Sequence, residues 1–434
     1  MTHRSLARSR FPYRWRIVAL LFFLSAINYL DRQTLSVLAK TVREVLGFTP
    51  VEYSYIVTGF LVAYATGYLF CGRVVDRIGV RLAVIIALSA WSLAAMGHAL
   101  ATGWMALLAW RFALGLGESF NAPCGVKALA EWAPKRERGL SIALFSNGNM
   151  LGAVIAPPLV AALAGLYGWQ WAFVITGSLG FVYLIFWSVY YEAPERQPRL
   201  PAAEREYILA ERSAPEAGVG TQISFRQALR HPAMLGFFVA RFLTDSISFF
   251  FSFWLPEYLQ TARGFSLAMV GVFAWMPFLA SDIGGPGGGA LSDWLVRRGW
   301  NPSAARRRVM LVAACLMPCS VVAVQVPSAY LALALIGIVL AAQSCWMANQ
   351  LTLLSETFPR EHVATYLSLS SVGGAIGGIL STLAAGRIIH SVGYGPVFVA
   401  LGFLHFLAYA AIVLGTRRAR RDRPSNPQVS GATP

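Results

Sequence analysis

Residues 72–81 read GRVVDRIGVR, and residues 289–299 read GALSDWLVRRG. In both segments an aspartate stands four residues after a glycine, and basic residues and a second glycine follow it. Each segment comes directly after an apolar run long enough to cross a bilayer, so each predicts a short turn between two membrane-spanning helices. The recurrence of one pattern at two places indicates that the chain consists of two similar halves.

A second pair of segments supports this internal repeat. Residues 131–137 (EWAPKRE) match residues 356–361 (ETFPRE), and the same shift in residue number brings 167–169 onto 392–394. We therefore predict two six-helix halves in the same orientation, an arrangement typical of transporters that bind substrate between the repeats. The predicted parts are a first bundle at 1–191, a charged cytoplasmic linker at 192–231, a second bundle at 232–415 and a disordered cytoplasmic tail at 416–434.

The composition is that of a membrane protein. Of the 434 residues, 56% are hydrophobic and only 13% are charged, whereas a soluble protein carries about 25% charged residues. Apolar runs recur from end to end, each about 20 residues long, which is the length that crosses a hydrocarbon core about 30 Å thick. We predict an all-α fold with twelve transmembrane helices, at 15–38, 52–73, 80–100, 103–130, 139–166, 169–191, 232–260, 266–291, 308–326, 328–355, 362–389 and 394–415.

The net charge of +16 could indicate a nucleic-acid partner, but the distribution of the Lys and Arg residues along the chain argues against one. With twelve spans, 28 of the 36 Lys and Arg fall on one side of the membrane and three on the other. This is the positive-inside pattern, which places both termini in the cytoplasm and the chain in the inner (cytoplasmic) membrane. The basicity therefore reflects topology, and no nucleic-acid partner is expected. The first apolar run is too long and too charged for a cleaved signal peptide.

Charged residues interrupt two of the predicted spans in the first half. Asp31 and Arg32 lie inside the first span, and Arg111 and Glu118 lie seven residues apart, on one face, inside the fourth. A charge at membrane depth costs about 3 kcal/mol, so such residues face a bundle interior or a wet cavity and have partners there. Two acids and two arginines are formally neutral, and a proton taken up by either acid leaves one positive charge for an anion to neutralise.

The alternative interpretation is structural. Asp31 and Arg32, or two salt bridges between helices, could only hold the bundle together. The same choice applies to the second half, where Arg241 and Asp245 form an obvious pair one turn apart and Asp282 is a further acid at membrane depth. Polar residues about one turn apart in the tenth span suit a hydroxylated carboxylate or a polar packing seam; these are Gln343, Trp346, Asn349 and Gln350.

The repeated turn resembles the loop motif of the major facilitator superfamily, with Val80 standing where a basic residue is usual. The resemblance covers both copies and fits the twelve spans. It implies the fold of that family and transport by alternating access. It also implies a gating role for the loop residues, which are Gly72, Asp76, Arg77 and Asp293.

Within that superfamily, the segment 28–32 together with Arg111 and Glu118 resembles the anion:cation symporter family. This family includes bacterial sugar-acid permeases and, more distantly, sialin and the vesicular glutamate transporters. The resemblance implies that Asp31 and Glu118 carry the coupling protons. It implies contacts with substrate or with the coupling charges for Tyr29, Arg32, Tyr64, Arg111 and Asn149.

Three further segments, 128–138, 241–259 and 277–282, look most like the hexuronate permeases of this family, which import galacturonate and glucuronate with a proton. The expected function is therefore proton-coupled import of an organic acid anion by a monomer in the lipid bilayer, with the proton as coupling ion and no cofactor or metal. Another carboxylate remains the alternative: an aldonate, an aldarate, or an aromatic acid such as phthalate or hydroxyphenylacetate. An enzyme is not expected, because the six His are scattered and no nucleotide-binding loop is present.

Overall fold

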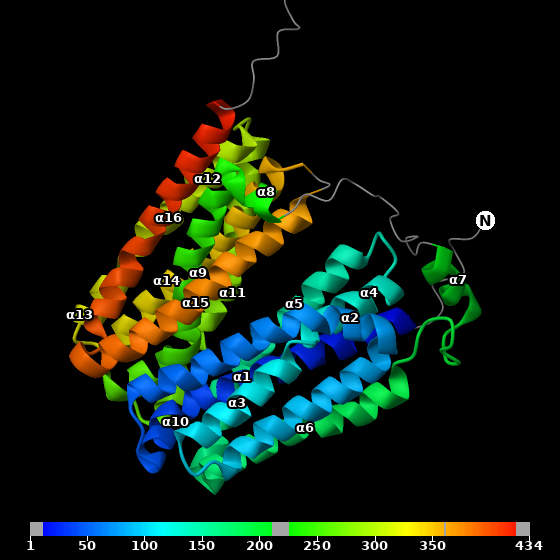
Figure 1. The fold of residues 1–434 in the computed structure, drawn as a ribbon, viewed down its shortest axis with the longest axis horizontal. Coiled ribbons are helices and arrows are strands. Elements are labelled where there is room, and N and C mark those ends of the chain that lie inside the picture. Colours follow the sequence, from blue (N-terminus) through cyan, green and yellow to red (C-terminus); the bar gives the residue numbers. More distant parts are fainter. Residues whose placement is uncertain (1–11, 211–224, 360–361, 422–434) are drawn as a thin grey trace, which may run out of the picture. The chain divides into compact units, whose positions relative to one another are not determined.

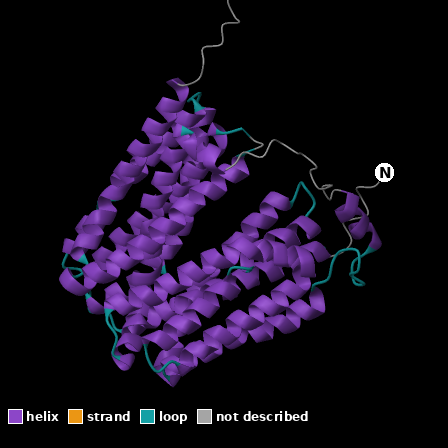
Figure 2. Ribbon diagram, viewed as in Figure 1, coloured by secondary structure: helices purple, strands orange, loops and turns teal. Residues whose placement is uncertain are grey.

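The computed structural model describes residues 12–210, 225–359 and 362–421, and within these residues the chain is helical and contains no strand (Figures 1 and 2). Arg360 and parts of the predicted linker and tail lie outside the described residues. The helices are α1 (Tyr13–Leu46), α2 (Pro50–Gly97), η2 (His98–Leu100), α3 (Trp104–Glu118), α4 (Asn121–Trp132), α5 (Arg138–Tyr167), α6 (Trp169–Tyr190), α7 (Ala202–Ala210), α8 (Phe225–Arg230), α9 (Pro232–Thr261), α10 (Leu267–Phe273), α11 (Met276–Arg297), α12 (Pro302–Leu316), α13 (Cys319–Gln325), α14 (Ala329–Thr357), α15 (Val363–Val392) and α16 (Gly395–Arg421).

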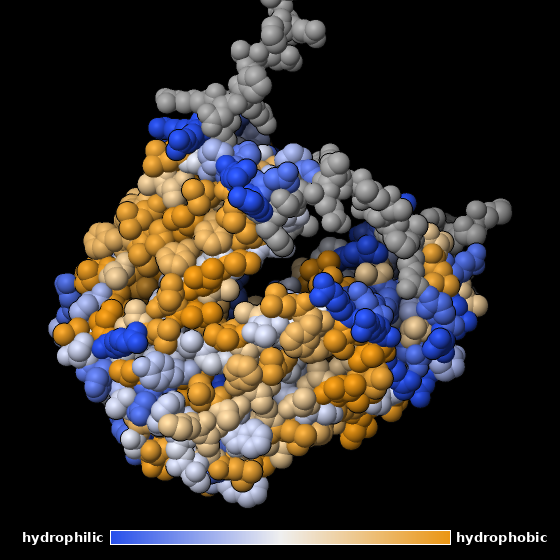
Figure 3. Space-filling view, in the orientation of Figure 1, coloured by the Kyte–Doolittle hydropathy of each residue, from blue (hydrophilic) through white to orange (hydrophobic). Residues whose placement is uncertain are grey.

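The helices supply the twelve predicted spans. In the described part of the chain, nine helical segments are long and apolar enough to cross a membrane, and one of them, Pro50–Leu100, is 51 residues long. That segment turns at Gly79 and accounts for two spans. The charged α1, and α3 with α4, supply the other two. Hydrophobic residues, orange in Figure 3, cover much of the visible helix surfaces, as contact with lipid requires.

The second glycine of each repeated turn has a backbone role. Gly79 has φ 78° and ψ 161°, which breaks α2 into two spans, and Gly299 after α11 has φ 89°. Glycine adopts these positive angles without the steric penalty that a side chain brings. The two turns are therefore built by the same device, which explains why both copies of the pattern contain a second glycine.

The packing of α5 on α1 is repeated by α15 on α9. A Cβ placed on Gly148 or Gly152 would overlap a backbone carbonyl oxygen of α1, that of Phe22 or that of Ala26. On α15, a Cβ on Gly373 or Gly377 would overlap the carbonyl oxygen of Phe238 or Phe242 on α9 in the same way. Pairs of glycines four residues apart permit this close backbone approach. The glycines of α5 and α15 are related by the same shift in residue number that brings 131 onto 356, whereas α1 and α9 are related by a slightly smaller shift.

The contact between α2 and α3 is repeated in the same way by α11 and α14. A Cβ on Gly67 would approach the carbonyl oxygen of Leu116 to 3.4 Å, and one on Gly284 would overlap that of Ala341. Leu116 and Ala341 are again related by the shift that brings 131 onto 356. These contacts confirm the repeat and assign equivalent positions, so that position 118 corresponds to 343 and position 32 corresponds to 248.

The chain folds into two compact units. Among the described residues, the first unit contains 12–210, 250–279 and 382–394, and the second contains 225–249, 280–359, 362–381 and 395–421. In the first unit α1 packs on α5 and α6, and α2 packs on α3 and α6. The domain boundaries stay a prediction, because they follow the sequence repeat and not these units.

Substitution of Gly148 by alanine is expected to lower the free energy of unfolding of the purified protein by about 1–3 kcal/mol, because the new Cβ would overlap the backbone of α1. Gly165 lies in the same helix with nothing within 4 Å of a Cβ. Gly165→Ala is therefore the matched control and should be neutral or slightly stabilising. Equal melting temperatures for the two variants would contradict the proposed close packing of α5 on α1.

Candidate functional site

Four charged residues lie in the interior of the first unit. Asp31 and Arg32 lie on α1, and Arg111 and Glu118 lie on α3. Arg111 and Glu118 are fully buried, Asp31 is 2% exposed, and the Arg32 side chain is 18% exposed. Ionised groups are rarely buried without a partner. The contacts of these four groups therefore decide what the cluster can do.

Arg32 and Glu118 form an ion pair between α1 and α3. The Nε and Nη2 atoms of Arg32 both donate to Oε2 of Glu118, at 3.0 and 2.8 Å. Nη2 also donates to Oδ1 of Asn28, one turn earlier on α1, at 3.5 Å. The second carboxylate oxygen of Glu118, Oε1, accepts no hydrogen bond from the described residues. Glu118 thus holds Arg32 through a single oxygen.

Three aromatic rings surround the guanidinium of Arg32. Its central carbon lies 5.6 Å from the ring centroid of Tyr29, 5.0 Å from Phe60 and 4.9 Å from Tyr64. Such rings attract a cation by about 0.5–2 kcal/mol each, depending on how fully water is excluded. They therefore keep Arg32 in place even when its ionic partner changes.

Asp31 and Arg111 make no ion pair with any described residue. Neither carboxylate oxygen of Asp31 has a hydrogen-bond partner there, and its electrostatic neighbours are Glu118, Trp91 and Arg111. Arg111 donates from Nη2 to the backbone oxygen of Arg32 at 2.8 Å and lies 4.8 Å from the ring of Phe60. Its Nε and Nη1 are without a partner in the described part of the chain.

If these charges only held the helices together, two salt bridges between helices would be expected. The structure contains one of them, between Arg32 and Glu118. A helix-locking role fits Arg32 and Glu118 but leaves Asp31 and Arg111 unexplained. Sequence reasoning missed Asn28, Phe60 and Trp91 as neighbours of these charges. Asn28 had a signal, because it stands one turn before Arg32, whereas an aromatic residue in an apolar helix has none.

The remaining first-half candidates differ in how they relate to the cluster. Tyr29 and Tyr64 belong to it through Arg32, and the hydroxyl of Tyr64 lies 3.5 Å from that of Tyr68. Asn149 is half-buried on α5, next to Gly148, and makes no hydrogen bond to the described residues. Its role in binding stays a prediction.

The second repeat has a neutral counterpart of the Arg32–Glu118 pair. At the equivalent positions, Gln343 on α14 donates through Nε2 to Oγ of Ser248 on α9 at 3.0 Å, and to the backbone oxygen of Thr244 at 2.9 Å. The same crossing of helices is thus joined by an ion pair in one repeat and by an amide–hydroxyl hydrogen bond in the other. The charged version occurs in the first repeat alone among the described residues.

The other three polar candidates of α14, Trp346, Asn349 and Gln350, are bonded within that helix. Trp346 is fully buried, and its indole N–H donates to Oε1 of Gln350 at 2.8 Å. Asn349 donates to the backbone oxygen of Cys345 at 2.9 Å. A T-shaped contact joins Trp346 to the buried His405 on α16, with the ring centroids 4.8 Å apart. These contacts are those of a polar packing seam, and substrate binding by Trp346 and Asn349 stays a prediction.

The charges of the second unit are arranged differently from those of the first. Arg241 donates to Oδ2 of Asp245 on the same helix, with an Nη2–Oδ2 distance of 2.7 Å. A Cβ on Gly374 would overlap that oxygen, so glycine makes room for the carboxylate. Asp282 on α11 is half-buried, and its Oδ2 has no hydrogen-bond partner in the described residues.

Two of the predicted gating residues form ion pairs. Asp76 binds Lys127 at 2.7 Å in the first unit, and Asp293 binds Arg306 at 2.6 Å in the second. Arg306 also reaches Glu356 at 3.3 Å. Arg77 is exposed, and a Cβ on Gly72 would meet nothing within 4 Å, so close packing does not require that glycine.

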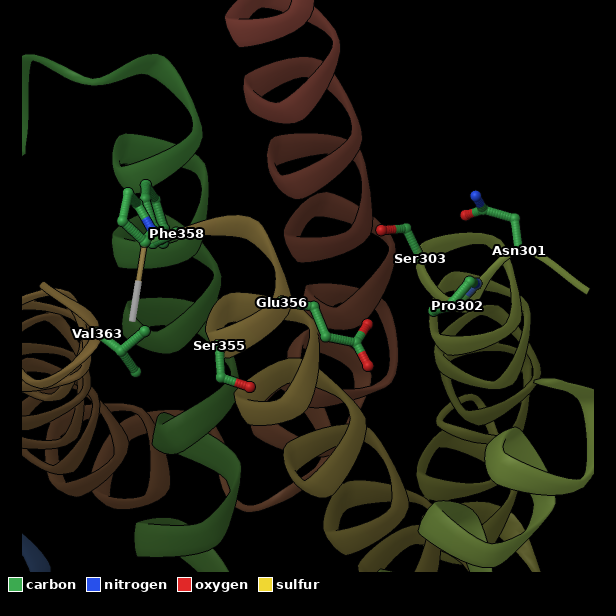
Figure 4. Close-up of a pocket in the computed structure, with 8 residues that line it drawn as sticks. Asn301, Pro302, Ser303, Ser355, Glu356, Phe358 and Val363 are labelled. Carbon is green, nitrogen blue, oxygen red and sulfur yellow. The ribbon is translucent and has the colours of Figure 1, made fainter. Parts of the chain in front are cut away.

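A cavity of about 900 Å³ is lined by none of the candidate site residues (Figure 4). It is lined by the first residues of α12, the last of α14 and Val363 of α15. Its charged residue, Glu356, is already paired with Arg306, and the side chain of Asn301 caps α12. No cluster of His, Cys, Asp or Glu among the described residues could hold a metal ion.

A second buried ion pair, which sequence reasoning missed, lies in the first unit. Arg43 on α1 binds Glu257 on α9 at 2.9 Å, and the Glu257 side chain is 1% exposed. Nearby, the hydroxyl of Tyr53 donates to the backbone oxygen of Phe253 at 2.8 Å. Arg43 and Glu257 stand close to the ends of their helices, where a charge is common, so no sequence pattern marks them as partners.

Replacing Arg43 by methionine is expected to lower the stability of the purified protein by about 3 kcal/mol, because Glu257 is left buried without a counter-charge. The double variant Arg43→Met/Glu257→Met should recover most of that loss. Lys40→Met is the matched control, since Lys40 and Glu44 form a more exposed pair on the same helix at 3.8 Å. Melting temperatures in detergent test this, and equal losses for the single and double variants would contradict it.

Known proteins show which family has this architecture. A family model described as the Major Facilitator Superfamily matches residues 21–342 and 300–434. The hexuronate transporter of Escherichia coli (strain K12) is 31% identical over 405 residues, which cover 93% of each chain. The galacturonate transporter of Dickeya chrysanthemi is 35% identical over 272 residues, covering 62% of this chain and 79% of that protein.

A solved structure, a bacterial homolog of the human lysosomal transporter Spinster, covers 96% of this chain and all of its own with a TM-score of 0.74. At 18% identity it supports the fold alone. The helical architecture and the sequence relatives define a multi-pass membrane transporter and not an enzyme. The chain belongs to the Major Facilitator Superfamily, and the predicted similarity to bacterial hexuronate permeases is confirmed.

Proposed function

We propose that this transporter imports an organic acid anion together with a proton, and that the anion is a sugar acid of the hexuronate class. The observation that carries the proposal is the ion pair of Arg32 and Glu118 beside the unpaired Asp31 and Arg111. Two acids and two arginines share one buried region, yet one salt bridge joins them. The cluster therefore has groups to spare for a proton and for an anion.

Coupling follows from competition for Arg32. While Glu118 is ionised, its Oε2 accepts from two nitrogens of Arg32. Once Glu118 takes up a proton, its attraction for the guanidinium falls, because a charge-assisted bond becomes a neutral one. A substrate carboxylate can then bind Arg32, whose side chain is 18% exposed and held by three aromatic rings. Release of the proton restores the internal pair and expels the anion.

Asp31 and Arg111 supply a second acid and a second cation to this mechanism. Both are buried, and Asp31 interacts electrostatically with Glu118 and with Arg111. A carboxylate that lacks a counter-ion in apolar surroundings either finds one or takes up a proton. We assign Asp31 as the second proton carrier, and Arg111 as a second cation that becomes available to the anion when Asp31 is protonated.

The substrate class rests on the relatives, which are named as transporters of hexuronate and galacturonate. Hydrogen-bonding groups for sugar hydroxyls are available from Asn28, whose amide nitrogen has no partner in the described residues, and from Tyr29, Tyr64 and Asn149. Another relative, from Escherichia coli O6:H1, is named as a D-galactonate transporter. The alternative substrate is another carboxylate: an aldonate, an aldarate, or an aromatic acid such as phthalate or hydroxyphenylacetate.

The remaining features are proposed on the same basis. We place the protein in the inner membrane with both termini in the cytoplasm, because the basic residues gather on one side. We propose a monomer without a cofactor, in which the proton is the coupling ion. The gating residues act through the ion pairs Asp76–Lys127 and Asp293–Arg306.

The test is uptake of labelled galacturonate into proteoliposomes, with and without an inward proton gradient, against unlabelled competitors. We expect accumulation that needs the gradient and that glucuronate competes for. Equal uptake with and without the gradient would refute proton coupling. Competition by galactonate, glucarate or phthalate in place of glucuronate would keep the mechanism and replace the substrate.

A further inference from the structure

A groove on the outer surface of the first unit belongs to neither the charge cluster nor the gating pairs. It has a volume of about 620 Å³ and runs between α1 and α6. Its walls are mainly apolar, with residues such as Leu20 and Phe23 on α1 and Val182 and Phe186 on α6. The floor is closed by a hydrogen bond from the hydroxyl of Tyr183 to the backbone oxygen of Leu20, at 2.9 Å. Phe23, Val182 and Phe186 remain about half exposed.

The length of the groove matches one leaflet of a bilayer. Its residues on α1 extend from Arg16 to Ile27, and eleven residues of helix span about 16 Å. Half of a hydrocarbon core about 30 Å thick is about 15 Å. The groove thus begins at a membrane surface, at Arg16 and Tyr190, and ends near the bilayer centre, at Ile27 and Leu179. This geometry suits one acyl chain.

Two guanidinium groups stand at the surface end of the groove. Arg16 lies 5.5 Å from the ring of Tyr13, and Arg199 lies 5.5 Å from the ring of Tyr190. Those two rings belong to one contact, because the hydroxyl of Tyr13 donates to the backbone oxygen of Tyr190 at 2.7 Å. Both arginines are exposed, and neither forms an ion pair with the described residues.

Two acids in this region, Glu204 and Glu137, are engaged by other groups. Glu204 accepts from the backbone N–H groups of Tyr13 and Arg14 and pairs with the Arg14 guanidinium, and Glu137 pairs with Arg14 as well. Arg16 and Arg199 therefore present positive charge to the headgroup layer. Basic pockets beside transmembrane helices on the cytoplasmic side bind anionic headgroups.

We propose that the α1–α6 groove is a binding site for an anionic phospholipid of the cytoplasmic leaflet. One acyl chain occupies the apolar groove, and the phosphate lies between Arg16 and Arg199. Because Arg199 belongs to the segment that follows α6, while Arg16 belongs to α1, the bound lipid joins the start of the linker to the first helix. The site is independent of the substrate that the transporter carries.

The test is lipid binding to the purified full-length protein, measured by native mass spectrometry. Phosphatidylglycerol is compared with phosphatidylcholine of the same acyl chains. We expect the anionic lipid to bind more tightly, and the variant Arg16→Gln/Arg199→Gln to lose about 25-fold in affinity for it, or about fivefold for each guanidinium. Ala19→Trp, which fills the groove without changing charge, should weaken the binding of both lipids.

The matched control is Arg308→Gln. Arg308 is an exposed arginine on α12, far in sequence from the groove, and it lies 5.5 Å from the ring of Trp300. Removal of the Arg308 charge by this substitution should leave the affinity for phosphatidylglycerol unchanged. Three results would each overturn the proposal. The wild type could bind the two lipids equally, or binding could be unchanged after the double substitution or after Ala19→Trp. Glycerol 3-phosphate at equal concentration could also displace the lipid. Arg16→Lys/Arg199→Lys, which keeps both charges, should retain most of the affinity and shows that the fold tolerates substitution there.

Discussion

Glu118→Gln is expected to abolish accumulation of substrate against its gradient while leaving exchange of substrate across the membrane. Glutamine keeps the size of the side chain and can still accept a hydrogen bond from Arg32. It cannot take up or release a proton. Arg32 is then permanently available to a substrate carboxylate, so binding and exchange continue, but the step that expels the anion on proton release is lost.

The measurement compares two assays on the same proteoliposomes. Gradient-driven uptake should fall at least 100-fold toward background, while counterflow of labelled against unlabelled galacturonate should remain within about fivefold of the wild type. Asp282→Asn is the comparison variant, since Asp282 is a half-buried acid on α11, in the second unit. We expect it to keep gradient-driven uptake. Full accumulation by Glu118→Gln would remove Glu118 from the coupling mechanism.

The second repeat already has a glutamine at the position equivalent to Glu118. Gln343 is the repeat equivalent of Glu118, and it bonds to Ser248 at the position equivalent to Arg32. The second repeat thus shows that a glutamine can join these two helices without a charge. This is the physical reason to expect that Glu118→Gln folds, and that its loss of coupling is not a loss of structure.

Most of the fold could be predicted from the sequence, because the signals are local. Apolar length and the distribution of the cations fix the spans, and each turn pattern contains its own glycine at positive φ, Gly79 or Gly299. The repeat was visible because two pairs of segments share one shift in residue number. Its continuation to Gly148 and Gly373 became evident only from the contacts, because the first helices of the two halves, α1 and α9, are related by a different shift.

The candidate site was predictable as a set of charges but not as a set of contacts. Asp31, Arg32, Arg111 and Glu118 are conspicuous in apolar helices, yet the sequence does not say which acid meets which arginine. The pairing of Arg32 with Glu118, which leaves Asp31 alone, depends on how α1 and α3 are rotated against each other. The ion pair of Arg43 and Glu257 escaped prediction for the same reason, since its two residues lie on helices from different halves of the sequence.

The second large effect is expected for Arg32, in two variants that separate stability from function. Arg32→Gln leaves the fully buried Glu118 without its counter-charge, which is expected to cost about 3–5 kcal/mol in stability. It also removes the cation that the substrate carboxylate would bind, so affinity for galacturonate should fall at least 100-fold.

Arg32→Gln/Glu118→Gln should recover the stability and not the binding. It replaces the ion pair by a neutral hydrogen-bonded pair of the kind that Gln343 and Ser248 already form at the equivalent crossing. The melting temperature should return close to that of the wild type, because position 118 no longer carries a buried charge without its partner, while galacturonate binding by calorimetry stays undetectable. If the double variant regains binding, the anion does not use Arg32. If it remains as unstable as Arg32→Gln, the loss comes from the guanidinium's contacts with Tyr29, Phe60 and Tyr64 and not from an unpaired carboxylate.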